Sequence, residues 1–320
     1  MSSTSFTNAT AASALSLLTG SSKALERNTI HVAAGRNINE AADNAAYWSI
    51  AKAMESTGMA LSSAEDASGL AAATADTAAL GMEAATGIVS EIQAKLILAR
   101  SSGVDKNAIN SEITQLKAQL GTVSASTSFS GENWLNAGAG ATPGVKSLVA
   151  SVSTGEDGTT NVNTIEFDTA TTTLTSSNNA ADGMLTKAYS GTTGNGSPYE
   201  YYMLDAGSTT PAPATAKEIK ISDATTNDEL DGMISATNSM LSSLTDAGAK
   251  LGATASRISA NTEFVKSLQE TNQRSIGRLV DADMEESVVK QRSLMAQQQL
   301  QTIGLNIINN RAKATLDLFR

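Results

Sequence analysis

Residues 50–99, IAKAMESTGMALSSAEDASGLAAATADTAALGMEAATGIVSEIQAKLILA, carry apolar or small side chains alternately every four and every three residues. This 3.5-residue period predicts one long helix whose apolar seam packs against partner helices, as in a coiled coil. Ala and Ser fill the middle of the seam, so a partner helix can come close. The seam positions are Ile50, Met54, Thr57, Leu61, Ala64, Ser68, Ala71, Ala75, Ala78, Met82, Ala85, Val89, Ile92, Leu96 and Ala99.

The same periodicity predicts helices before and after this stretch. Ser101-Ser102-Gly103 interrupts the long seam, and Gly103 is the expected C-terminal cap. The seams near the two termini are narrow, and a narrow apolar stripe needs a partner helix, so we expect them to pair with each other and with copies of the chain. The further seams are Ile109, Ile113, Leu116, Leu120 and Val123; Leu230, Ile234, Thr237, Leu241, Leu244, Gly248, Leu251, Ala255, Ile258, Thr262 and Val265; Ala11, Leu15, Leu18, Ser22, Leu25, Thr29 and Val32; and Val289, Ala296, Leu300, Ile303, Ile307 and Ala314.

The composition changes over residues 136–224. All four prolines lie there, and all nine arginines lie outside residues 101–256. Alternating runs at 164–167 and 218–221 predict strands, and Asp157-Gly158 predicts a hairpin turn. The sequence therefore predicts a mainly α protein: a long antiparallel coiled-coil-like helical rod built from both chain ends, with a small β-rich central insert.

Composition also restricts the chemistry open to the chain. The net charge of −10 disfavours a nucleic-acid partner, because phosphate binding needs a basic face. The lack of Cys excludes disulfides and thiolate metal sites, and a single histidine, His31, excludes a multi-histidine metal site. No apolar run reaches the roughly 18 residues that span a bilayer, and residues 1–20 do not read as an ordinary secretory signal. We expect no cofactor, no metal and no membrane partner.

The acidic cluster at 281–286 begins like a calcium-binding loop. Glu286 and Arg292, however, stand where the loop needs Gly and Glu, so the coordination shell cannot close. A helix start is the expected role, because acidic side chains in a first turn favour the helix dipole.

The single histidine and the aromatic residues near helix ends are the other candidates for a special role. His31 has no Asp and nucleophile at the spacing of a catalytic triad, and is expected to be a packed or surface residue. Tyr47, Trp48 and Trp134 are expected to staple helix ends, because large rings dominate burial where cores are thin.

Residues 35–46 read GRNINEAADNAA. They resemble the segment Gly-Leu-Arg-Ile-Asn-Ser-Ala-x-Asp-Asp-Ala-Ala of bacterial flagellins, in a form typical of rhizobia and related alphaproteobacteria, with Arg36-Asn37 and Asn44 as departures. Tyr47-Trp48 replaces the Gly-Leu that follows in the family. The resemblance covers 1–135 and 225–320. Its other segments are 50–51 (IA), 112–116 (EITQL), 129–131 (FSG), 251–253 (LGA), 281–286 (DADMEE) with Arg278 before it, and 312–319 (AKATLDLF).

The resemblance implies a structural protein, not an enzyme, that polymerises into the flagellar filament of a motile bacterium. It implies terminal helices at 1–40 and 284–320 in the inner filament core, a helical rod domain at 41–135 and 225–283, and a surface-exposed variable insert at 136–224. The terminal segments are expected to be disordered alone and to order on assembly. The polymerisation interface is expected at Leu15, Leu18, Leu25, Leu300, Ile303, Ile307, Leu316 and Leu318.

The resemblance also implies partners and a location. The expected partners are copies of this chain and sister flagellins, the flagellar type III export apparatus and its chaperone, and the filament cap and hook-junction proteins. The chain is expected to be secreted without cleavage and to lie outside the cell in the filament.

Three alternatives stay open. A hook-filament junction protein shares such termini, and composition does not separate it from a filament subunit. A secreted enzyme with its active site in the insert is disfavoured, because residues 136–224 hold no Cys and no His. A helical signalling receptor would need a membrane span or an adaptor-binding tip, and neither is recognisable.

Overall fold

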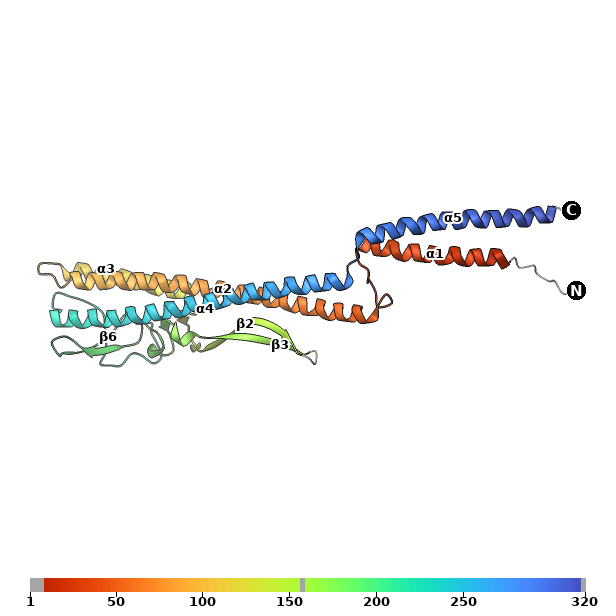
Figure 1. The fold of residues 1–320 in the computed structure, drawn as a ribbon. Helices are drawn as coiled ribbons and strands as arrows, with labels where there is room; N and C mark the ends of the chain where they lie inside the picture. The colour runs from red at the N-terminus through yellow and green to blue at the C-terminus, as the bar shows by residue number, and fades with distance from the viewer. Residues whose placement is uncertain (1–8, 156–158, 318–320) are drawn as a thin grey trace. The chain divides into compact units, whose positions relative to one another are not determined.

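The computed structural model describes residues 9–155 and 159–317, and long helices account for most of them (Figure 1). The chain divides into two compact units. Unit 1 comprises Met1–Met59 with Gln269–Arg320, and unit 2 comprises Ala60–Leu268. The prediction of a mainly α fold with a small central strand region is confirmed.

The elements follow one another in the order helix, helix, helix, strands, helix, helix. The helices are α1 (Ala9–Ala34), α2 (Ala45–Leu98), α3 (Lys106–Ser126), α4 (Asn227–Val280) and α5 (Met284–Asp317), and the short 3-10 turns are η1 (Thr169–Thr171) and η2 (Ala180–Asp182). The strands are β1 (Asn136–Ala137), β2 (Val145–Thr154), β3 (Thr160–Asp168), β4 (Thr175–Ser176), β5 (Tyr189–Thr192), β6 (Pro198–Tyr202) and β7 (Lys217–Glu218).

The Ala-rich seam of α2 forms the centre of unit 2. Every predicted seam position from Leu61 to Ala99 is buried. In this unit α2 and α4 run antiparallel: Gln93 Nε2 donates to Asn238 Oδ1 at 2.5 Å, while Ser68 and Asn261 both donate to adjacent carbonyls of β2. The seam prediction fails at its first position, in unit 1, where Ile50 is 48% exposed and Ala51 is buried instead.

The buried face of α4 is wider than the predicted seam. Leu230 and each seventh residue after it are buried to Val265, as predicted, but Met233 and Met240 are buried where the pattern placed Ile234 and Leu241. The reason is that α4 also packs against strands. Gly232 lies at this second contact. A Cβ added there would be 2.9 Å from Cβ of Tyr199 and 3.1 Å from the ring of Tyr201, both in β6.

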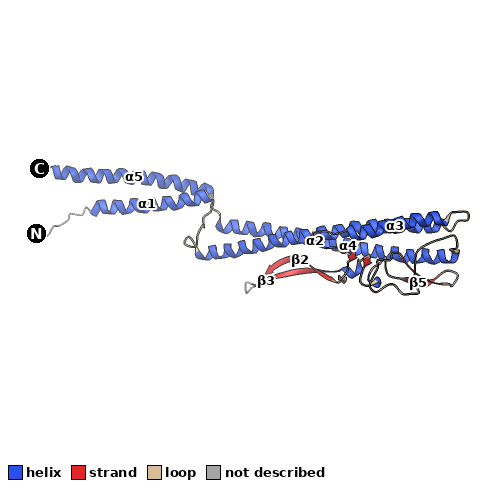
Figure 2. Ribbon diagram, turned by 180° about the vertical axis from the view of Figure 1, so that it is seen from behind, coloured by secondary structure: helices blue, strands red, loops and turns tan. Residues whose placement is uncertain are grey.

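The strands lie along one side of the unit 2 helices (Figure 2). β2 and β3 form an antiparallel hairpin with a bulge between Val149 and Ser151, and β5-β6-β7 form a three-stranded sheet in which β6 and β7 are parallel. β1 and β4 pair in parallel. The insert is therefore part of the unit 2 core, to which it contributes the fully buried side chains Leu174, Leu185, Met203 and Ile219.

The two predicted strands had different outcomes. Residues 164–167 lie in β3, as predicted. Of residues 218–221 only Glu218 is in a strand, because Ile221 N–H donates to Oδ1 of Asn110 on α3 at 3.0 Å and so leaves the ladder. The predicted turn at Asp157-Gly158 lies outside the described residues.

Trp134 connects the end of the helical segment to the insert. Its ring is buried and stacks on Phe167 of β3, with 4.7 Å between ring centroids. The neighbouring Leu135 fits against Gly81 of α2, where a Cβ would come within 2.7 Å of the leucine methyl. Trp134 thus packs across elements and does more than staple a helix end.

A buried ion pair joins α3 to β7. Lys117 is buried and donates to both a carboxylate oxygen of Glu218 and the carbonyl of Ile219. Burial lowers the pKa of Lys117. Burial would raise the pKa of Glu218, but hydrogen bonds from Lys117 and Lys220 together hold that pKa below its usual value.

We predict that Glu218→Ala lowers the free energy of unfolding by about 3 kcal/mol, because it leaves the buried Lys117 ammonium without its carboxylate. The matched control is Lys220→Ala, which removes the exposed partner of the same carboxylate and should cost less than about 1 kcal/mol. Urea unfolding followed by circular dichroism measures both. Equal effects of the two substitutions would contradict the assigned role of Lys117.

Candidate functional site

In unit 1, α1 and α5 form an antiparallel pair held by polar side chains. Ser21 Oγ donates to Gln301 Oε1 at 2.5 Å, and Asn28 Nδ2 donates to the carbonyl of Ser287 at 2.9 Å. Ser21 and Asn28 are the buried residues among the described positions of α1. The pairing of the two chain ends is therefore directional and hydrogen-bonded.

The positions that face the partner helix repeat alternately every three and every four residues. On α5 these positions include three glutamines, so polar and apolar side chains share the contact. The facing positions, buried or half-buried, are Ala11, Ala14, Leu18, Ser21, Leu25, Asn28 and Val32 on α1, and Ser287, Gln291, Leu294, Gln298, Gln301, Leu305 and Ile308 on α5.

The predicted interface residues are divided between this contact and the outside. Leu18 and Leu25 are half-buried and face α5. Leu316 lies in α5 with its side chain outside the description, and Leu318 lies outside the described residues. The remaining four are exposed: Leu15 by 55%, Leu300 by 68%, Ile303 by 56% and Ile307 by 55%.

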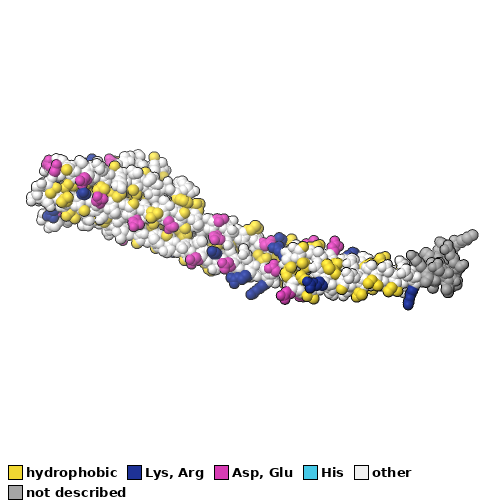
Figure 3. Space-filling view, turned by 90° about the horizontal axis from the view of Figure 1, so that it is seen from above, with side chains coloured by type: hydrophobic (Ala, Val, Ile, Leu, Met, Phe, Trp, Pro, Cys, Tyr) yellow, Lys and Arg dark blue, Asp and Glu magenta, His cyan; other side chains and the backbone are white. Residues whose placement is uncertain are grey.

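The two terminal helices pair with each other, as expected, but these four residues lie outside that contact, and their pairing with copies of the chain stays a prediction. The helix pair is rotated so that Ser and Thr hydroxyls of α1 form hydrogen bonds with Gln side chains of α5 across the contact. Apolar side chains consequently reach the surface of this part of the chain, as Figure 3 shows on its right, where α1 and α5 lie. We call Val289, Leu300, Ile303 and Ile307 the outer row of α5.

The sequence reasoning missed the polar contact because it followed the apolar pattern alone. A signal was present: Ser21 and Asn28 are seven residues apart, and so are Gln291 and Gln298. Polar residues at this spacing mark a helix face as well as leucines do.

The two segments that follow α1 and α4 pair with each other. Gly35, with φ of +68°, ends α1 and accepts a hydrogen bond from Ala282 N–H at 3.0 Å. Asn37 N–H donates to the carbonyl of Val280 at 2.7 Å, and Arg36 forms a bridge with Asp281.

A small apolar cluster lies beside these segments. Ile38, Ala51 and Val280 are buried, and Trp48 is half-buried against them. The expected stapling role of Trp48 is confirmed, whereas Tyr47 is exposed.

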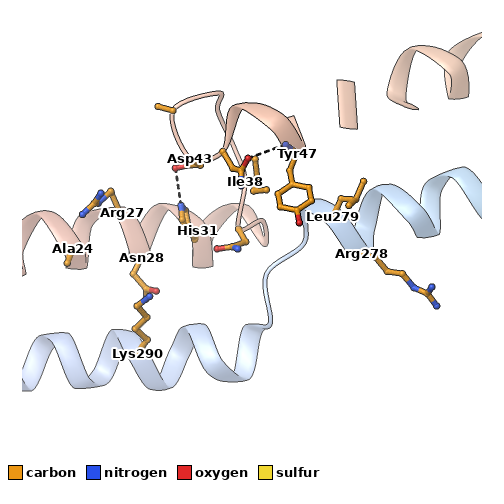
Figure 4. A pocket seen from close by; sticks show the side chains of 13 residues that line it. Ala24, Arg27, Asn28, His31, Ile38, Asp43, Tyr47, Arg278, Leu279 and Lys290 are labelled. Atoms are coloured by element: carbon orange, nitrogen blue, oxygen red, sulfur yellow. Dashed lines mark hydrogen bonds and ion pairs between the residues drawn. The ribbon is translucent and has the colours of Figure 1, made fainter. Parts of the chain in front are cut away.

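A polar hollow of about 630 Å³ lies in unit 1, bordered by α1, the segment after it and α5 (Figure 4). His31 Nε2 lies 3.6 Å from Asp43 Oδ1. The Asp43 carboxylate also accepts hydrogen bonds from the N–H groups of Asn39 and Glu40, and the Asn39 bond is the main reason that its pKa is lowered. Asp43 therefore closes the turn before α2.

Polar and charged side chains form most of the lining of this hollow. The residues that line it include Arg27, His31, Asp43, Tyr47 and Lys290, and none of its lining residues is Ser, Thr or Cys. The His31–Asp43 pair ties α1 to the turn, in keeping with the expected role of His31 as a packed residue.

The acidic cluster begins α5. Asp283 Oδ1 accepts the N–H groups of Glu285 at 3.0 Å and Glu286 at 3.2 Å, which caps the helix and confirms the predicted helix start. Over residues 9–155 and 159–317, no His, Cys, Asp and Glu side chains gather into a group that could hold a metal ion. No helix in those same ranges is long and apolar enough to cross a membrane.

Comparison with known proteins identifies the family. Residues 6–139 match the model of the bacterial flagellin N-terminal helical region, and residues 234–319 match the model of the bacterial flagellin C-terminal helical region. Flagellin C of Rhizobium meliloti (strain 1021) is 44% identical over 318 residues, which cover 98% of each chain. Flagellin A of that strain is 33% identical, over 98% of this chain and 99% of the relative, and a flagellin of Brucella melitensis is 30% identical, over 98% of each. The chain belongs to the bacterial flagellins and is a structural subunit of the flagellar filament.

Proposed function

We propose that the outer row of α5 and the exposed apolar side chains of α1 are the surface through which copies of this subunit associate in the filament core. The observation that carries the proposal is the exposure of Leu15, Leu300, Ile303 and Ile307 in a chain whose family polymerises. Complete burial stabilises by about 1.5–3 kcal/mol for each such side chain. Leu316 and Leu318 are included in the proposed surface because of the sequence pattern alone. Leu18 and Leu25 contribute by packing between α1 and α5.

The proposal assigns three regions to the chain. Residues 1–40 and 284–320 would form the inner core, residues 41–135 and 225–283 the layer around it, and residues 136–224 the outer surface. The contact between α1 and α5 supports this division, because its apolar side chains are only half-buried and four more are exposed, so neighbours are needed to bury them fully.

We further infer how the chain reaches the filament and what it meets there. Membership of the flagellins supports secretion without cleavage through the flagellar type III export apparatus with a chaperone, and contact with sister flagellins, the filament cap and hook-junction proteins. The proposed role is structural and has no catalytic step. The relatives that match almost the whole chain carry the name flagellin, which favours a filament subunit over a hook-filament junction protein.

We predict that Ile303→Asp abolishes filaments but leaves export intact. A carboxylate on the outer row would have to be buried on assembly, at a cost of several kcal/mol. The matched control is Asn306→Asp, which adds the same charge one turn away at an exposed polar position off the row. Electron microscopy of cells and immunoblots of the medium measure filaments and export. Normal swimming by the Ile303→Asp strain would show that the assigned face is wrong.

We also predict that removing residues 1–20 or residues 301–320 abolishes seeded polymerisation while unit 2 stays folded. The buried core of unit 2 lies within Ala60–Leu268 and needs neither end. Sedimentation measures polymer, and circular dichroism measures the helical content that remains. Polymer at the wild-type yield from both truncated chains would refute the prediction.

A further inference from the structure

The exposed flank of α2 in unit 2 is acidic. Over residues 60–94 the helix carries five Asp or Glu residues and no Lys or Arg. Glu65, Asp76 and Glu83 are separated by eleven and seven residues, which places them on one face of the helix. None of these three carboxylates has an ion-pair partner in the described part of the chain. We call Glu65, Asp76 and Glu83 the acidic row.

Asp76 of the acidic row lies at an open groove between α2 and α4. The groove has a volume of about 610 Å³, and Asp76 and Glu263 lie at it. Small side chains form most of the rest, and a Cβ at Gly69 would meet open space. Small residues allow the backbone of another segment to come close, so this flank can accept a helix. The small lining residues are Gly69, Ala72, Ala255, Ser256, Ser259 and Ala260.

The complementary charge lies on α4. Lys250 and Arg257 are both exposed, and neither has an ion-pair partner among residues 9–155 and 159–317. They are seven residues apart, the same separation as Asp76 and Glu83. Seven residues span roughly 10.5 Å of helix, so two oppositely charged pairs could form at once between two such helices. We call Lys250 and Arg257 the basic row.

The two rows cannot neutralise each other within one chain. α2 and α4 of unit 2 meet through their buried seams. Outside those seams, Glu65 is half-buried and the other members of the two rows are exposed. A surface with an acidic row in one place and a matching basic row in another suits a head-to-tail contact, which repeats into a ring or a helical polymer.

We propose that the acidic row of α2 in one subunit docks against the basic row of α4 in a second copy of the chain. The proposal rests on assembly of this chain into a filament, and it adds a charged lateral contact in unit 2 to the apolar contact proposed for unit 1. Complementary charge steers encounters and rejects wrong registers, and its effect weakens as salt screens it.

The test is seeded polymerisation of full-length protein on short filaments of the same protein, at low and high salt. The variants are Asp76→Lys with Glu83→Lys, Lys250→Glu with Arg257→Glu, and all four substitutions together. Each double substitution alone should raise the critical concentration for polymerisation about tenfold at low salt, because two attractive charge pairs become two repulsive ones. The fourfold variant should recover most of the loss, and added salt should narrow the differences.

Two controls separate this contact from net charge and from misfolding. Glu166→Lys changes an exposed carboxylate on β3 and should leave polymerisation unchanged. Glu83→Lys makes the same change in charge and should weaken polymerisation. Asp76→Asn with Glu83→Gln removes the charge with little change of shape and should still weaken assembly. Circular dichroism of each monomer checks the fold.

Wild-type critical concentration and salt dependence in the Asp76→Lys/Glu83→Lys chain would overturn the proposal, as would an equal loss in Glu166→Lys. An unmodified chain that does not grow on seeds would instead contradict the filament role itself, and this interface with it.

Discussion

The close contact along the Ala-rich seam of α2 is the constraint on which the rest of unit 2 depends. Ala71, Ala75, Ala78 and Ala85 offer little volume to fill a core, so the structure gains burial by bringing backbones near each other. Larger side chains on the same helix, among them Met82, Ile92 and Leu96, are also fully buried. The buried face of one helix therefore combines small residues with large ones.

The insert extends that core. Its strands lie along the helices, and the segments that flank or connect these strands add Leu174, Leu185, Met203 and Ile219 to the same buried cluster. The stacked rings of Trp134 and Phe167 and the ion pair of Lys117 attach the insert at separate points. Because the buried ammonium requires its carboxylate, the position of β7 on α3 is specific.

Unit 1 differs from unit 2 in the side chains that its helices bring together. Polar groups meet between α1 and α5, while Leu300, Ile303 and Ile307 are exposed to water in the single chain. Hydrogen bonds give this helix pair a defined register, and its apolar facing side chains are no more than half-buried in the single chain. Such an arrangement suits a segment whose apolar side chains become buried only among copies of the chain. The charged rows proposed for unit 2 would add a second contact between copies, one that salt weakens.

The sequence by itself determined the long helices, the position of the insert, the α2 seam from Leu61 to Ala99, the cap at Asp283 and the family. These follow from local periodicity, capping and motif spacing, which act over a few residues. Tertiary structure alone decided the rotation of α1 against α5, the wider buried face of α4, the short length of β7 and the burial of Lys117. Each of these depends on which distant group comes close, such as Gln301 to Ser21 or Asn110 to Ile221, and no local pattern encodes that proximity.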